Sequence, residues 1–347
     1  MRFGLIGLGG IGQVRKAAIE QSTECSLTAA FDINKDMAAQ LASDVHFFDS
    51  AEELLTSNVC DAVIISTPTN FHAEQSIAAM QAGKHVLVEK PMASSLEECK
   101  RMLDVSKQTG KVLTVGFNHR YFAAIKEMRE AIQSQAIGKL SYIRAYTGHT
   151  GLSEFKSPWM YDKDIMGGGT LMDNGIHTLD LTQHLMGGVK SVSGITLTDI
   201  WKLDRSEDNG FALMRGNENV VATFHSSWTE WKGYRFFLEA YGNKGMVRAY
   251  YAPMMSTLIT MEKPGGKRMV KRNFHISSIF REKIKGWQST VIQTFLEELS
   301  DFVALTKDET ATGHIARAED GVRVTEIAQA IYKSSSDGGS VELTVNI

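Results

Sequence analysis

The first residues of the chain constrain its fold more than any other segment. An apolar run at residues 2–8, RFGLIGL, passes directly into the glycine-rich sequence GLGGIG, and helix-like residues 12–22 follow. Gly7, Gly9 and Gly12 therefore have G-x-G-x-x-G spacing between a predicted strand and a predicted helix. In that setting glycines permit a tight turn, close approach of the backbone to a pyrophosphate, and close helix–strand packing.

An acidic residue ends the next predicted strand, SLTAAFD. Asp32 stands 20 residues after Gly12, where a carboxylate accepts hydrogen bonds from ribose hydroxyls and repels a 2′-phosphate. This favours NAD over NADP, although NADP remains possible because Lys35 lies nearby. The predicted cofactor contacts of this segment are Gly7, Gly9, Gly10, Ile11, Gly12 and Asp32.

Strand-like and helix-like segments alternate over about the first 120 residues. The most distinct strand is CDAVIISTP, because a continuous β-branched run is typical of a parallel strand buried on both faces. The pattern predicts an α/β chain with an N-terminal Rossmann domain, a doubly wound parallel sheet, over residues 1–120. Strands are predicted at 2–8, 26–32, 60–68, 84–91 and 111–117, and helices at 12–22, 35–44, 72–83 and 95–110.

The pattern changes beyond residue 120. A helix is predicted at 122–137, and residues 189–275 hold mostly strand-like segments separated by turns such as GNEN and GNKG. Such turns indicate hairpins in an antiparallel sheet. The second domain is therefore predicted as α+β over residues 121–347, with helices in 289–335 able to pack back toward the first domain.

Polar residues follow two successive predicted strands. Ligands of open parallel sheets gather at the carboxyl ends of the strands, so these residues are expected to face a cofactor. Pro91 fixes its own φ and restricts the preceding backbone, which sets the direction of Lys90. Ordinary turn chemistry and a solvated lysine are the alternatives. The predicted contacts are Thr67, Pro68, Asn70, His72, Glu89 and Lys90.

Residues 167–180, GGGTLMDNGIHTLD, place an acid and a histidine at helical spacing after three glycines. At i and i+4, Asp173 and His177 share one face of an α-helix. They are interpreted either as a catalytic pair or as a packed pair in the core. The glycines are expected to let this loop pass close to a cofactor. Asp180 and His184 continue the stripe and are interpreted as buried structural groups; no metal is expected because nothing completes a ligand shell.

These motifs together resemble the Gfo/Idh/MocA oxidoreductase family over essentially the whole chain. GLGGIG with Asp32, STPTNFHAE, VEKP, GFNHRY and GGGTLMDNGIHTLD occur in the order and spacing of that family. The resemblance implies a second domain whose large open, mostly antiparallel sheet forms homodimer or homotetramer contacts. It also implies that Lys90 is the catalytic lysine, Asp173 the substrate-side carboxylate and His177 the proton-transfer residue. Asn118 matches a position that faces cofactor or substrate, whereas Arg15 replaces a histidine found in many members.

The expected activity is hydride transfer from a secondary hydroxyl of a sugar, glycoside or cyclitol to NAD. That chemistry needs a base and a positive group near the developing alkoxide, which His177 and Lys90 would supply around one carbon. The alternatives are an NADP-dependent keto-sugar reductase and a non-catalytic cofactor-sensing regulator on the same fold. Further substrate contacts are expected from Arg120, Trp159 and Tyr161. The alternative for Arg120 is a surface salt bridge, and the alternative for the two aromatic residues is a role as loop anchors.

The composition excludes several other classes of protein. Of the 347 residues, 43% are hydrophobic and 22% charged, as in an ordinary globular protein. A net charge of −3 without a basic block argues against nucleic acid, and no apolar run approaches the roughly 18 residues of a membrane span. Three cysteines without metal-like spacing indicate a reducing compartment. A cytoplasmic protein with a small polyhydroxyl substrate is expected.

Overall fold

The computed structural model describes residues 1–153 and 157–343, and the chain divides into two compact units. Unit 1 contains Met1–Asn118 and Lys285–Val322, and unit 2 contains His119–Ile284 and Arg323–Ile347. The sequence placed the boundary at residue 120 and predicted that helices in 289–335 pack back toward the first domain. In the structure, Lys285–Val322 belongs to the same compact unit as Met1–Asn118.

Unit 1 is built on a seven-stranded sheet in the order β15-β6-β5-β4-β1-β2-β3. Strand β1 pairs in parallel with both β2 and β4, so the strand order reverses between those two neighbours. This is the Rossmann order, with its ligand crevice at the carboxyl ends of the strands. The strands are β1 (Arg2–Ile6), β2 (Ser26–Phe31), β3 (His46–Phe47), β4 (Ala62–Ile65), β5 (His85–Val88), β6 (Leu113–Val115) and, antiparallel at the edge, β15 (Ala316–Arg317).

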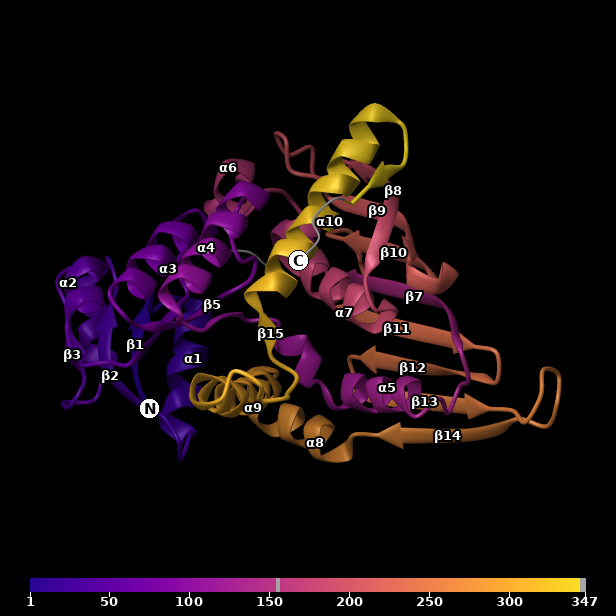
Figure 1. Cartoon of the computed structure of the whole chain (residues 1–347), viewed down its shortest axis with the longest axis horizontal. Coiled ribbons are helices and arrows are strands. Elements are labelled where there is room, and N and C mark those ends of the chain that lie inside the picture. Colours follow the sequence, from indigo (N-terminus) through magenta and orange to yellow (C-terminus); the bar gives the residue numbers. More distant parts are fainter. Residues whose placement is uncertain (154–156, 344–347) are drawn as a thin grey trace. The chain divides into compact units, whose positions relative to one another are not determined.

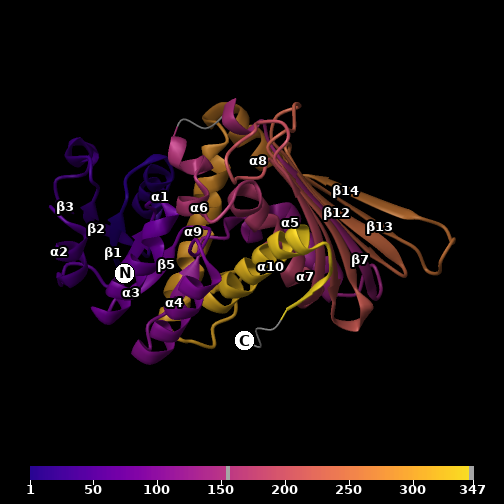
Figure 2. The same cartoon turned by 90° about the horizontal axis from the view of Figure 1, so that it is seen from above.

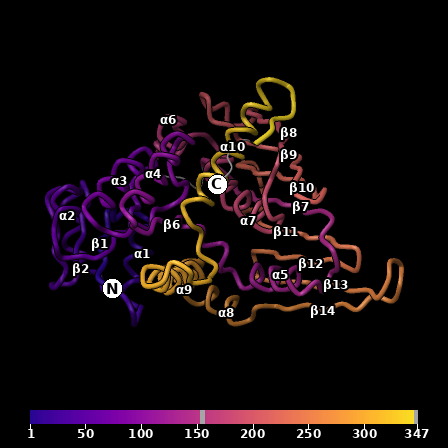
Figure 3. Tube along the Cα trace, viewed as in Figure 1, coloured from indigo at the N-terminus to yellow at the C-terminus, as the bar shows by residue number. Residues whose placement is uncertain are grey.

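Helices cover both faces of this sheet (Figure 1). Helices α1 (Gly10–Gln21) and α9 (Gln288–Lys307) pack against each other on one side, and Figure 3 shows the trace of α9 returning beside α1. The rings of Phe3 and Phe302 lie 5.7 Å apart between sheet and helix. The other side carries α2 (Ala51–Thr56), α3 (His72–Gln81) and α4 (Leu96–Thr109). Double coverage explains why β4 is apolar throughout.

The prediction of an α-helix at residues 35–44 is wrong. Only a 3-10 helix, Lys35–Gln40, forms there, and none of its residues is buried. The Asn34 side chain accepts a hydrogen bond from the Asp36 amide, a local bond that competes with α-helix formation. Met37 and Leu41 pack against the core but are only partly buried, so little burial is available to stabilise a longer α-helix.

Unit 2 is built on a nine-stranded sheet in the order β14-β13-β12-β11-β7-β10-β9-β8-β16. Its neighbours are antiparallel except for the parallel pair β7 and β10, so the prediction of a mostly antiparallel sheet is confirmed. The strands are β7 (Leu140–Gly148), β8 (Val189–Leu197), β9 (Asn209–Gly216), β10 (Val221–Ser227), β11 (Arg235–Gly242), β12 (Gly245–Tyr251), β13 (Met255–Thr260), β14 (Met269–Phe274) and β16 (Val341–Glu342).

One face of this sheet carries helices and the other is open (Figure 2). Helix α5 (Ala123–Gln133) packs on β12 and β13, and α7 (Ile176–Met186) packs on β7 and β10. Alternate strand residues point to the open face, where large apolar side chains remain exposed: Tyr142, Ile195, Phe211, Leu213 and Val221. The remaining helices are α6 (Lys163–Met166), α8 (Ile276–Lys285) and α10 (Ala318–Asp337), which begins in unit 1 and continues in unit 2.

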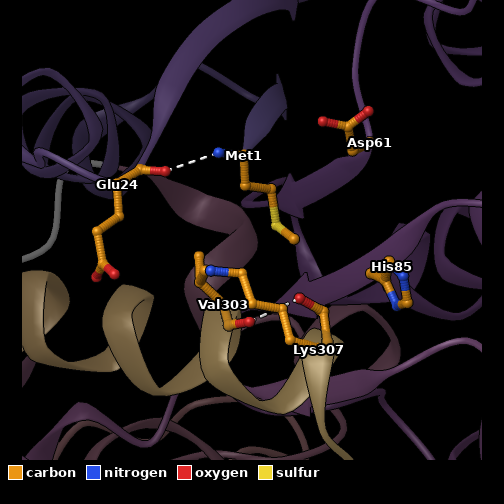
Figure 4. A pocket seen from close by; sticks show the side chains of 7 residues that line it. Met1, Glu24, Asp61, His85, Val303 and Lys307 are labelled. Carbon is orange, nitrogen blue, oxygen red and sulfur yellow. Dashed lines mark hydrogen bonds between the residues drawn. The ribbon is translucent and has the colours of Figure 1, made fainter.

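A pocket of about 400 Å³ lies at the amino ends of β1, β4 and β5. Met1, Asp61, His85 and Lys307 are among the residues that line it (Figure 4). Dinucleotides bind at the opposite, carboxyl edge of such sheets, so this pocket plays no part in the site below. Across the described ranges, no helix has both the length and the apolarity needed to cross a bilayer.

Candidate functional site

The glycine turn after β1 has the geometry of a dinucleotide loop. Gly7 has a φ of +91°, which L side chains rarely adopt. A Cβ built at Gly9 or Gly10 meets nothing within 4 Å, so the backbone there borders open space. Helix α1 starts at Gly10 without a side-chain cap, and amides at such a helix start attract phosphate.

Asp32 is held directly beside this turn. Its carboxylate accepts hydrogen bonds from the Leu8 amide at 2.6 Å and from the Asn34 amide at 2.8 Å. The neighbouring Ile33 side chain is 91% exposed. Lys35 donates to Asp49 at 2.6 Å, so the structure directs this cation to another carboxylate. The turn, the helix start and Asp32 thus fit a dinucleotide that carries free ribose hydroxyls.

The loop after β4 contributes one group that fits a cofactor amide. Asn70 Oδ1 is buried and accepts no hydrogen bond from the residues that the structure describes. Thr67 instead donates to Gln75 Oε1 at 2.8 Å, and Pro68 precedes the 3-10 helix Thr69–Phe71. Asn70 is therefore the strongest candidate of this loop.

His72, predicted as a cofactor contact, is buried and bonded to two loops of unit 1. It is 1% exposed, and its ring nitrogens lie 2.9 Å from the carbonyl oxygens of Pro91 and Thr67. Burial lowers the pKa of this imidazole. The side chain thus links the loops after β4 and β5, and it can affect a ligand only through the backbone that it holds.

The segment Glu89–Lys90–Pro91 (EKP) follows β5. Glu89 is buried, whereas Lys90 is partly exposed. Glu89 Oε2 accepts from the Lys90 amide at 3.3 Å. Arg15, which replaces a histidine found in many family members, is 0% exposed and donates to Glu89. Its side chain is therefore not directed at a pyrophosphate. Asn118 is also buried and donates to Thr294 on α9 at 3.0 Å.

In unit 2, the GGG segment leads into a π-helix, Leu171–Gly175, that continues as α7. The Gly175 amide donates to the Thr170 carbonyl at 2.8 Å, a π-type bond, and π turns are frequent at functional sites. A Cβ on Gly168 would overlap the Tyr332 hydroxyl, and a Cβ on Gly169 would overlap the Glu207 backbone. Gly168 and Gly169 therefore allow close internal packing at this position.

Glu207, which sequence reasoning missed, holds this helix start. Its carboxylate accepts from the amides of Gly169 and Leu171, each at 2.8 Å, and from the Tyr332 hydroxyl at 3.0 Å. Burial raises the pKa of Glu207, although these hydrogen bonds oppose the shift. A single loop acid carries no sequence signal for such a role, because its partners come from distant segments.

Asp173 lies in a buried clamp. Its Oδ2 accepts from His149 Nε2 and from Trp228 Nε1, each at 3.1 Å. His149 Nδ1 accepts from the Gly151 amide at 3.0 Å, so the ring proton lies on Nε2 and points to the carboxylate. Two donors stabilise the ionised form of Asp173. Neither His149 nor Trp228 is among the site residues predicted from the sequence.

Tyr161 lies at the same clamp. Its ring meets the Trp228 ring edge-on, with centroids 5.9 Å apart. Burial and the charge of Asp173 raise the pKa of Tyr161, which places the phenol near that carboxylate. Trp159 is partly exposed on the same 3-10 helix, Pro158–Tyr161. Tyr161 therefore remains a candidate substrate contact.

His177 is oriented by stacking. Its ring lies parallel to the His119 ring, with centroids 4.0 Å apart and an interplanar angle of 14°. His119 stacks in turn on Phe122 at 4.4 Å. The imidazole is buried within this column, and a ring held in this way keeps a fixed direction.

Arg120, predicted as a substrate contact or a salt-bridge partner, forms an ion pair in the structure. Its guanidinium donates to both oxygens of Asp180, at 2.7 and 2.5 Å, and both side chains are buried. Such a bidentate pair is strong and fixes the direction of the guanidinium. The structural interpretation of Asp180 is thus confirmed, whereas His184 is partly exposed rather than buried.

Comparisons with known proteins match both parts of the chain. Residues 1–117 match the oxidoreductase family with an NAD-binding Rossmann fold, and residues 125–248 match the GFO/IDH/MocA C-terminal domain. The myo-inositol 2-dehydrogenase of Thermotoga maritima is 28% identical over 99% of this chain and 98% of its own. The D-glucoside 3-dehydrogenase of Escherichia coli is 30% identical over 56% of each chain.

A solved structure shows the same fold. Levoglucosan dehydrogenase in complex with NADH and levoglucosan superposes with a TM-score of 0.88 at 22% identity, over 99% of each chain. The strand order of unit 1 and the large open sheet of unit 2 agree with these matches. The chain therefore belongs to the Gfo/Idh/MocA family of NAD-binding oxidoreductases.

Proposed function

We propose that this protein is an NAD-dependent dehydrogenase that oxidises a secondary hydroxyl of a sugar, glycoside or cyclitol to a ketone. The observation that carries the proposal is the clamp on Asp173, four residues before the stacked imidazole of His177. Because two donors fix the direction of the buried Asp173 carboxylate, this group is suited to accept hydrogen bonds from substrate hydroxyls. The relatives named above act on inositol, glucoside and levoglucosan, all polyhydroxylated rings.

The cofactor half of the proposal rests on unit 1. The amides at the start of α1 would hold the pyrophosphate, and Asp32 would accept from the ribose hydroxyls. Asn70 Oδ1 would accept from the nicotinamide amide. NAD supplies the hydride acceptor when it is bound. Lys35 is engaged by Asp49, which supports NAD rather than its 2′-phosphorylated form.

The protein residues handle the proton and the charge. We assign His177 the role of general base, because an imidazole exchanges protons near neutral pH. Lys90 would donate a hydrogen bond to the reacting oxygen and lower the pKa of the hydroxyl. Asp173 would accept from a neighbouring substrate hydroxyl and so fix which carbon reacts. The roles of Asp173 and His177 need side chains with a fixed direction, which the clamp and the stack supply.

The open face of the sheet in unit 2 supports a further part of the proposal. Large apolar side chains rarely stay exposed together on a monomer, and Tyr142, Phe211 and Leu213 lie on neighbouring strands of this face. We propose that two copies of the chain pair through it, as a homodimer or within a homotetramer.

The test is a panel of sugars, glycosides and inositols assayed for NADH formation with NAD and with NADP. Calorimetric titration with NADH runs in parallel. Turnover with NAD, lost in His177→Ala with NADH affinity retained, is the expected result. His46→Ala, at an exposed histidine on β3, serves as the control. NADH binding without turnover of any substrate would replace the enzyme with a cofactor sensor.

A further inference from the structure

A fully buried ion cluster lies behind the EKP segment of unit 1. Arg15 on α1 donates through Nε to Glu89 Oε1 at 2.6 Å, and through Nη1 to Glu298 Oε2 on α9. Its guanidinium carbon lies 3.5 Å from the centre of the Phe295 ring. The three charged side chains are between 0% and 6% exposed. One arginine thus joins a helix, a strand end and a second helix.

Only arginine can make this connection. A planar guanidinium presents donors in several directions and stacks on an aromatic ring, whereas a lysine offers a single point of charge. The neighbouring backbone is also adapted, because a Cβ on Gly116 would lie 2.6 Å from Arg15 Nη2 and 3.2 Å from Glu89 Oε2. The strand end and the arginine therefore fit one another closely.

The cluster holds two carboxylates and one cation, so it carries excess negative charge when both acids are ionised. Buried uncompensated charge is costly, and a proton on one acid removes it. Burial raises the pKa of Glu298 to about 7, against the opposing effect of Arg15. The charged groups that face Glu298 are Arg15 on α1, Glu89 after β5 and Asp301 on α9 itself.

The cluster reaches Lys90 through Glu89. One oxygen of Glu89 is held by Arg15, and the other accepts from the Lys90 amide at 3.3 Å. Both oxygens of this carboxylate are therefore fixed. Because the backbone of Lys90 is bonded to Glu89, any change in the placement of Glu89 is passed to the lysine.

We propose that Arg15 and Glu298 are positioning residues for Lys90, which they orient through Glu89. The inference rests on the role proposed above for Lys90. Arg15 is 0% exposed, so it acts on Lys90 only through Glu89.

The first test needs no substrate. Competitive labelling of lysines with acetic anhydride at a single pH, read by mass spectrometry, reports how accessible the Lys90 amine is relative to the other lysines. Glu298→Gln keeps the size and the acceptor of the side chain but removes the charge that holds Arg15. The relative labelling rate of Lys90 should rise, because its backbone is then less firmly held.

The matched control is Glu309→Gln, at an exposed glutamate beyond the end of α9, which should leave the labelling rate of Lys90 unchanged. An unchanged rate in Glu298→Gln overturns the positioning role, even if the wild-type enzyme turns over its substrate. A raised rate supports the positioning role, even if no substrate is found and the dehydrogenase proposal fails.

The second test separates positioning from cofactor binding. Arg15→Lys keeps a charge but cannot span both acids, so kcat should fall by about 10-fold or more while NADH affinity changes less than about twofold. Equal loss of kcat and NADH affinity would mean that Arg15 only supports the fold. Should Arg15→Lys not fold, the near-isosteric Glu298→Gln variant still decides the inference.

Discussion

Replacing Glu298 by glutamine should remove a specific pH dependence from the stability of the protein. The folded-state pKa of Glu298 is raised from 4.5 to about 7, because burial penalises the carboxylate more than Arg15 stabilises it. The native state therefore binds a proton that the unfolded state has released. This contribution is fully present below about pH 4.5 and is lost as the pH rises through about 7.

The magnitude follows from the shift. The difference between 4.5 and about 7 is about 2.5 pH units, and each unit corresponds to about 1.36 kcal/mol. Relative to Glu298→Gln, the wild-type free energy of unfolding should thus fall by about 3 kcal/mol between pH 4.5 and about pH 8. The lost ionic hydrogen bond to Arg15 adds an offset between the proteins, so the informative quantity is the slope of their difference.

Urea denaturation followed by circular dichroism, with both proteins measured at each pH, gives that slope. Comparison at equal pH cancels the titration of all other groups. Glu309→Gln should show a flat difference, since its side chain is exposed on the loop after α9. A flat difference for Glu298→Gln as well would refute the reasoning, because the buried acid would then have the same proton affinity in both states.

Four further outcomes are expected. Trp228→Phe removes one donor to Asp173 and should lower kcat/KM by about 10-fold or more, measured with the best substrate of the panel. Asp32→Ser should lower kcat/KM for NAD by about 10-fold and improve the relative use of NADP, since the group that repels a 2′-phosphate is gone. Gly169→Ala places a methyl group on the Glu207 backbone and should lower the unfolding free energy by about 1–3 kcal/mol, read by urea denaturation. Leu213→Lys, on the open face of the sheet in unit 2, should shift sedimentation velocity toward monomer, and unchanged sedimentation would exclude that face as the interface.

The secondary structure was predictable where its cause is local. The strands with continuous apolar runs and the helices with apolar stripes appear within a few residues of their expected positions. Failures occurred where burial is slight, as in segment 35–44, or where elements are very short, as in β3. A short, exposed segment has no periodic pattern to reveal it.

The candidate site was predictable as a set of residue types but not as a set of contacts. Asp173 and His177 were identified by helical spacing, yet Asp173 lies within a π-helix, and the structure supplies their partners from elsewhere in the chain. Arg120 was expected at the substrate and is paired with Asp180. His72 was expected at the cofactor and is buried between two carbonyl groups. In each case the hydrogen-bond partner cannot be predicted from the residues near it in the sequence.

The amino-acid sequence by itself determined the dinucleotide fold, because positive φ at a glycine, a helix start and a carboxylate at a strand end are properties of short segments. Tertiary structure alone decided which groups hold the reactive side chains. Trp228 lies 55 residues from Asp173, and Glu298 lies 283 residues from Arg15. A hydrogen bond depends on distance in space, and only the packing of sheet and helices brings such residues together.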